Sequence, residues 1–103
     1  MTRRTAVPTL LAALATVPAL PAPAPAAVVD CHVFAYYPNV LISSARNMTC
    51  RAAARDMKRY KRSISRTFRT PGGFRCTRVS GGEFGGQWRC VKGGRAYRFE
   101  FGD

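Results

Sequence analysis

The sequence predicts a small α+β domain, in which one amphipathic helix packs on a three-stranded antiparallel β-meander. Three observations predict this class: apolar residues recur at helical spacing over 49–69, they alternate from Phe74 onward, and the chain carries four cysteines. A short strand or hairpin is expected before the helix. Disulfides are expected to staple a domain whose small core would otherwise give little stability.

The first 26 residues have the pattern of a secretory signal peptide. Arg3 and Arg4 form a positive start, residues 5–20 are uncharged, and Ala24-Pro25-Ala26 fits a cleavage site of small residues. Cleavage would leave residues 27–103 as a single small cationic domain with no transmembrane segment. We therefore expect a protein that is secreted or associated with the cell envelope, and its heavy use of Ala and Arg indicates a bacterial source.

A short hairpin is predicted ahead of the helix. Residues 31–37 are apolar and β-prone, Pro38-Asn39 marks a turn, and residues 40–43 form a second short strand. The helix is predicted over 49–69, with Thr49 as its N-cap and Pro71-Gly72-Gly73 beyond its end. At about 100° per residue, one face is apolar: Cys50, Ala53, Ala54, Met57, Tyr60, Ile64 and Phe68. The opposite arc is basic: Arg51, Arg55, Lys58, Arg59, Arg62, Arg66 and Arg69.

After the helix, the alternation predicts three strands with an aromatic inward face. The segment from Gly81 to Gly86 is expected to be a long, pliable loop, with Phe84 folded back onto it. Gly93-Gly94 predicts a tight hairpin turn, which would place Trp88 opposite Phe99 and Arg89 opposite Arg98.

The four cysteines predict two disulfides, since a chain with this leader folds in an oxidising compartment. Centring the glycine loop on Glu83 places Cys76 across from Cys90, which favours that bond together with Cys31–Cys50. The crossed pairing, with Cys50 joined to Cys76 or Cys90, stays open. The spacings contain no CxxC pair, so no metal and no cofactor are expected.

Several short motifs resemble a group of small exported actinobacterial domains of uncharacterised function. The motifs are Cys50-Arg-Ala-Ala-Ala, then Gly73-Phe74-Arg-Cys76, then Arg89-Cys90-Val-Lys-Gly93-Gly94 followed by Tyr97-Arg-Phe99. The resemblance spans roughly Cys31 to Phe101. It implies an exported α+β domain and carries over no catalytic residues.

The basic residues give the main functional prediction. The chain has 17 Lys and Arg against 5 Asp and Glu, and a bias toward arginine favours forked contacts to phosphate or carboxylate. We expect non-enzymatic binding of an anionic polymer or envelope surface; a merely solvated basic surface is the simple alternative. The predicted anion-binding residues are Arg51, Arg55, Lys58, Arg59, Arg62, Arg66, Arg89 and Arg98.

Other functions receive weaker support from the sequence. Nucleic acid is not favoured as the partner, because no binding module is recognisable. A secreted inhibitor or effector that presents the Gly81–Gly86 loop is the main alternative. Among enzymes, the available His and acidic residues would best suit a ribonuclease using His32 with Glu83 or Glu100. No His or acidic residues have the sequence spacing of a known catalytic pair, however. The sequence sets no oligomeric state.

Overall fold

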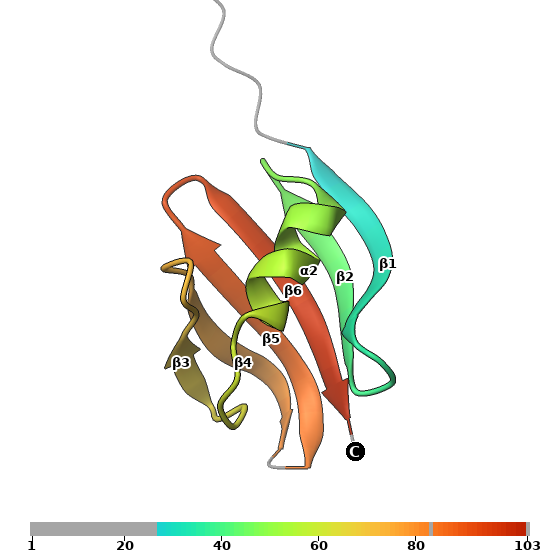
Figure 1. Ribbon diagram of the computed structural model, residues 1–103, viewed down its shortest axis with the longest axis vertical. Coiled ribbons are helices and arrows are strands. Elements are labelled where there is room, and N and C mark those ends of the chain that lie inside the picture. Colours follow the sequence, from blue (N-terminus) through green and yellow to red (C-terminus); the bar gives the residue numbers. More distant parts are fainter. Residues whose placement is uncertain (1–26, 83, 103) are drawn as a thin grey trace, which may run out of the picture.

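The computed structural model describes residues 27–82 and 84–102, so the predicted signal peptide lies outside the described residues. Within these residues, six strands form one antiparallel sheet in the order β1-β2-β6-β5-β4-β3, and one helix, α2, lies across it (Figure 1). The elements are β1 (Val28–Tyr36), β2 (Val40–Arg46), α2 (Cys50–Lys58), β3 (Thr67–Arg69), β4 (Arg75–Gly82), β5 (Gly85–Lys92) and β6 (Arg95–Gly102). The predicted α+β meander of three strands is therefore wrong, because the domain is mostly β.

The N-terminal hairpin is part of the main sheet. β2 pairs antiparallel with β6, which places Ile42 opposite Phe99 and Ala45 opposite Tyr97. Ile42 and Ala45 are fully buried, so β2 extends the inward apolar face of the meander rather than standing apart from it. The short alternation in 40–45 was too weak a signal to show this pairing in advance.

The helix is shorter than predicted. Thr49 is its N-cap, as expected, and its hydroxyl accepts a hydrogen bond from Ala52 N at 3.0 Å. The helix ends at Lys58, however, where the Tyr36 hydroxyl donates to the carbonyls of Lys58 and Tyr60. This side chain from β1 satisfies carbonyl groups that a longer helix would have used itself.

The segment that was predicted to continue the helix forms a connection and the edge strand β3. Phe68 of β3 pairs with Cys76 of β4, and Trp88 Nε1 donates a 2.8 Å hydrogen bond to the Ser65 carbonyl. Ile64 and Phe68 still pack against the core, so their apolar spacing was interpreted with the wrong period. Ile64 and Phe68 are apolar because they are partly buried against the core from an extended segment, not from a helix.

The predicted register of the meander is confirmed. Trp88 lies opposite Phe99, and Arg89 lies opposite Arg98. The glycine segment differs from the prediction: β4 and β5 continue into it, with Gly81 opposite Gly86. A Cβ atom on Gly81 would collide with the backbone of Gly86, so this close pairing requires glycine. Phe84 is 74% exposed at the hairpin tip, and the prediction that it folds back is wrong.

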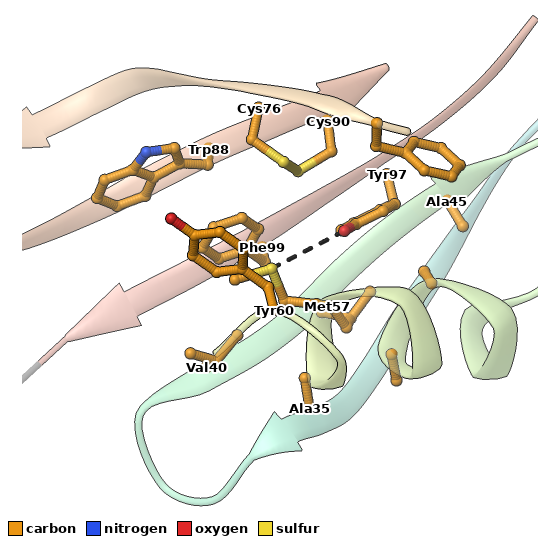
Figure 2. Packing of buried hydrophobic residues seen from close by; sticks show 14 residues of the cluster. Ala35, Val40, Ala45, Met57, Tyr60, Cys76, Trp88, Cys90, Tyr97 and Phe99 are labelled. Atoms are coloured by element: carbon orange, nitrogen blue, oxygen red, sulfur yellow. Dashed lines mark hydrogen bonds between the residues drawn. A yellow bond between two sulfur atoms is a disulfide. The ribbon is translucent and has the colours of Figure 1, made fainter. Parts of the chain in front are cut away.

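The core lies between α2 and one face of the sheet (Figure 2). Ala53 and Met57 of the helix are fully buried against this face, and Trp88 stacks on Phe99 with ring centroids 5.4 Å apart. No described helix covers the other face of the sheet, which we call the outer face. The aromatic residues therefore form the inner layer, and the residues that alternate with them face outward.

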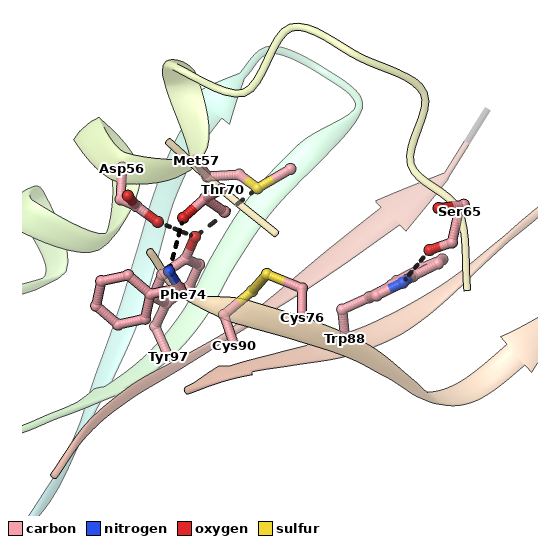
Figure 3. The surroundings of a disulfide bond; sticks show 9 residues. All are labelled: Asp56, Met57, Ser65, Thr70, Phe74, Cys76, Trp88, Cys90 and Tyr97. Atoms are coloured by element: carbon pink, nitrogen blue, oxygen red, sulfur yellow. Dashed lines mark hydrogen bonds between the residues drawn. A yellow bond between two sulfur atoms is a disulfide. The ribbon is translucent and has the colours of Figure 1, made fainter. Parts of the chain in front are cut away.

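Both disulfides follow the pairing that the sequence favoured, and the crossed pairing is not formed. Cys76–Cys90 bridges directly opposed residues of β4 and β5 within the core, and Figure 3 shows its surroundings. Cys31–Cys50 joins β1 to the start of α2. The two bonds thus fasten the helix to one edge of the sheet and reinforce the β4–β5 hairpin.

Candidate anion-binding surface

Two neighbouring rows of directly paired residues cross all six strands on the outer face. The first row is Asp30, Ser44, Arg98, Arg89, Thr77 and Thr67. The second row is Val28, Arg46, Ala96, Val91, Arg75 and Arg69. Members of the two rows are two residues apart on every strand, so their side chains share one face. The rows hold five arginines and a single acid.

We call these five residues the outer arginine face: Arg46, Arg69, Arg75, Arg89 and Arg98. Four of them are exposed, and Arg89 is half-buried. The residues between them in the rows have small or short side chains, mainly Ser, Thr, Ala and Val. The arginine side chains therefore extend further from the sheet than their neighbours do. Such a surface leaves room for an extended ligand to lie across the strands.

Two directly opposed pairs of arginines lie on this face, Arg69 with Arg75 and, nearer the middle of the sheet, Arg89 with Arg98. These residues are cross-strand partners, and like charges in that position destabilise a sheet by a few tenths of a kcal/mol. A shallow pocket of about 420 Å³ adjoins Arg89 and Arg98 and is also lined by Arg46, Ser44 and Asp30. An anion in this pocket would relieve the repulsion and accept hydrogen bonds from guanidinium groups.

The structure separates the predicted anion-binding residues into three places. Arg51, Arg55 and Lys58 lie exposed on α2, with Arg59 at its C-cap, all on the inner side of the sheet. Arg62 and Arg66 lie in the connection before β3. Arg89 and Arg98 lie on the opposite side, on the outer arginine face. The prediction of one continuous basic arc of seven residues on the helix is therefore wrong, because the helix ends before Arg62, Arg66 and Arg69.

Sequence reasoning missed Arg46 and Arg69 as members of the outer face. Arg69 was placed on the helix, and Arg46 could be placed only after β2 was known to pair with β6. The signal for Arg69 is its position two residues after Thr67, which continues the strand alternation around Phe68. Two other arginines are used for packing on the inner side, since Arg78 lies over the ring of Trp88 and Arg95 over that of Phe74.

A second polar feature lies on the inner side, where the Tyr97 hydroxyl donates to Asp56 Oδ2 at 2.7 Å. Burial, this hydrogen bond and the charge of Asp56 all raise the pKa of Tyr97 far above its ordinary value. The tyrosine therefore keeps its proton and acts as a donor to the carboxylate. Both residues are buried, which gives the pair a structural role between α2 and β6.

The residues of the hypothetical ribonuclease are not assembled into a site by the described chain. His32 is exposed on β1 and Glu100 is exposed on β6, with β2 between these strands. Glu83 lies outside the described residues. Within residues 27–82 and 84–102, no three His, Cys, Asp or Glu side chains cluster in a way that could hold a metal ion.

Comparison with protein-family models, with curated proteins and with solved structures finds no match to the chain. The resemblance to exported actinobacterial domains accordingly stays a prediction. Among the described helices, none has the length and apolar character needed to cross a membrane. Two disulfides are typical of a protein that folds in an oxidising compartment.

Proposed function

We propose that this protein is an exported, non-enzymatic domain that binds an anionic polymer of the cell envelope through the outer arginine face. The observation that carries the proposal is the arrangement of five arginines and one acid in two rows across all six strands. This arrangement belongs to one hydrogen-bonded sheet, so the backbone positions from which the arginines project are fixed relative to one another before a ligand arrives. Binding therefore requires no ordering of the backbone, and the entropy that is lost is that of the exposed arginine side chains.

The chemistry of the face favours a polymer with repeated phosphate or carboxylate groups. Arginine contacts both groups with two parallel hydrogen bonds, and the overall charge of +12 attracts any polyanion at a distance. Single-stranded nucleic acid fits less well, because such ligands are bound by aromatic residues on which bases stack. The two rows contain no aromatic residue.

The proposal is tested with a poly(glycerol phosphate) chain as the probe and the oxidised protein in solution. Arg89→Gln combined with Arg98→Gln should weaken binding and lower the slope of log K against log salt by about 1.4, since each lost phosphate contact removes about 0.7. The matched control is Arg55→Gln combined with Arg59→Gln, which removes the same charge from the helix side. The control should retain the wild-type slope.

Three results would contradict the proposal. Binding that does not weaken with salt would rule out contacts to phosphates. Loss of binding in the helix variant alone would place the ligand on α2. Equal loss in both variants would indicate attraction by net charge without a defined surface.

A second candidate function rests on the tip of the β4–β5 hairpin. Phe84 is 74% exposed there, and an exposed aromatic side chain on a projecting hairpin is a suitable anchor for a protein partner. A secreted inhibitor or effector would bind through this residue independently of salt. Phe84→Ala should then abolish capture of the partner, whereas polymer binding by the outer arginine face should not change.

A further inference from the structure

The two edges of the sheet differ in how well they are protected from pairing with another chain. Figure 1 shows β3 at one margin and β1 at the other. β3 has only three residues, ends at Arg69 and is followed by Pro71, all of which discourage strand addition. β1 has nine residues and contains no Lys, Arg or Pro. β1 is therefore the edge that can accept another strand.

The side chains of β1 leave apolar surface in water. Four large apolar residues on this strand are between 39% and 54% exposed: Val28, Val29, Val33 and Phe34. They come in two consecutive pairs, and neighbouring residues on a strand point to opposite faces. Both faces of the edge are thus apolar, which is unusual for an edge strand that meets only solvent.

The distribution of charge identifies what can approach this edge. All but two of the 17 Lys and Arg residues lie between Arg46 and Arg98, and residues 27–45 contain none. Two copies of so basic a protein repel each other over most of their surfaces. The β1–β2 hairpin is the exception, because its only charged side chain at neutral pH before Arg46 is Asp30.

We propose that two copies of this chain associate by antiparallel pairing of β1 with β1, forming one continuous sheet across a two-fold axis. Such an interface is self-complementary, with backbone hydrogen bonds between the two edges and the exposed valines and Phe34 covering each other. Register shifts between Asp30 and Val33 and between Phe34 and Tyr36 interrupt β1, so the regular stretches for this pairing are Val28–Asp30 and Val33–Phe34. Residues 27–45 carry no Lys or Arg, so two copies meet at this edge without direct repulsion between basic side chains.

The geometry of this association has a consequence for ligand binding, which rests on the function proposed above. The two-fold axis of edge-to-edge antiparallel strands is perpendicular to the sheet, so the outer faces of both copies lie on the same side. The pocket beside Arg89 and Arg98 reaches β1 through Val28 and Asp30, close to the shared edge. A dimer would therefore present two outer arginine faces to one polymer and gain avidity.

The association is tested by sedimentation velocity of the oxidised protein over a range of concentrations, without any polymer. The wild type should be dimeric at the higher concentrations, and Val29→Lys combined with Val33→Lys should be monomeric. Thr67→Lys adds charge to the other edge strand and should remain dimeric. Circular dichroism and thermal unfolding establish that each variant is folded.

Hydrogen exchange gives a second measurement on the wild type, which does not depend on any variant. Amide groups of β1 should become protected as the protein concentration rises, whereas those of β3 should not. A wild type that stays monomeric, or a dimer that survives the β1 substitutions, overturns the proposal. Equal dissociation of the Thr67→Lys variant also overturns it, since net charge would then explain the effect. None of these outcomes depends on whether the outer arginine face binds a polymer.

Discussion

The hydrogen bond from Tyr97 to Asp56 joins the helix to the centre of the sheet. Its length is 2.7 Å, and Asp56 is the one buried carboxylate of residues 27–82 and 84–102 (Figure 3). Asp56 lies among basic residues on the helix sequence, but its position on the buried side was not evident from the apolar pattern. A buried carboxylate needs a donor, and Tyr97 supplies it.

Replacing Tyr97 with phenylalanine should lower the free energy of unfolding by about 1–3 kcal/mol, because it leaves the buried Asp56 carboxylate without this donor. Denaturant unfolding of the oxidised protein measures the change. Tyr37→Phe is the matched control, since Tyr37 is 81% exposed and its loss should change stability by less than about 0.5 kcal/mol. Equal effects of the two substitutions would show that the hydrogen bond between Tyr97 and Asp56 adds nothing to the free energy of unfolding.

The raised pKa of Tyr97 predicts loss of stability in alkali. Above about pH 10, the tyrosine of the unfolded chain loses its proton, whereas the buried Tyr97 of the folded protein keeps it. The unfolded state then binds fewer protons than the folded state, so stability falls as pH rises, by up to about 1.4 kcal/mol per pH unit from this residue. The Tyr97→Phe variant should show a shallower decline between pH 10 and 11. Parallel pH profiles of the two proteins would contradict this assignment.

The parts of the fold that follow from local pattern were predictable from the sequence. The register of β5 and β6 follows from the two-residue turn at Gly93-Gly94, and the helix start follows from the capping residue Thr49. In both cases the determining residues lie within a few positions of the feature they determine. The alternation around Phe99 also identified the inner face of the meander.

The parts that depend on distant contacts were not predictable. The helix stops where Tyr36, more than twenty residues earlier, donates to the carbonyls of Lys58 and Tyr60, and Trp88 donates to the carbonyl of Ser65 in the following connection. The spacing of Ile64 and Phe68 suits both a helix and an extended chain. For the same reason, the candidate surface was predicted as a helical arc joined by Arg89 and Arg98, although the arginines that share one face come from different strands.

Thr49→Ala should destabilise the protein by about 1 kcal/mol, because α2 is only nine residues long and its cap satisfies the Ala52 amide. The helix also carries no acidic residue in its first turn that could compensate. Thermal unfolding measures the loss. Thr49→Ser retains the hydroxyl and should behave nearly as the wild type, so a similar loss in both variants would show that the cap is not the cause.

Gly72→Ala should be destabilising for a steric reason. A Cβ atom at this position would collide with the carboxylate of Asp56, which is held in place by Tyr97. The expected cost is about 1–3 kcal/mol, as for other additions to a packed region. Gly94→Ala is the control, because the nearest atom to a Cβ there is Asn47 Nδ2 at 3.6 Å, an ordinary contact. An equally destabilised Gly94→Ala variant would mean that the Asp56 contact is not the reason.

The two disulfides should differ in how readily a thiol reductant attacks them in the folded protein. Both sulfurs of Cys76–Cys90 belong to residues with no exposed surface, whereas Cys31 and Cys50 are half-buried near the sheet edge. Exchange requires access of the attacking thiolate to sulfur, so limiting dithiothreitol should reduce Cys31–Cys50 first. Alkylation followed by peptide mapping identifies the reduced cysteines, and the same reaction in denaturant should remove the preference. Earlier labelling of Cys76 and Cys90 under native conditions would show that the β4–β5 hairpin opens before the helix detaches from β1.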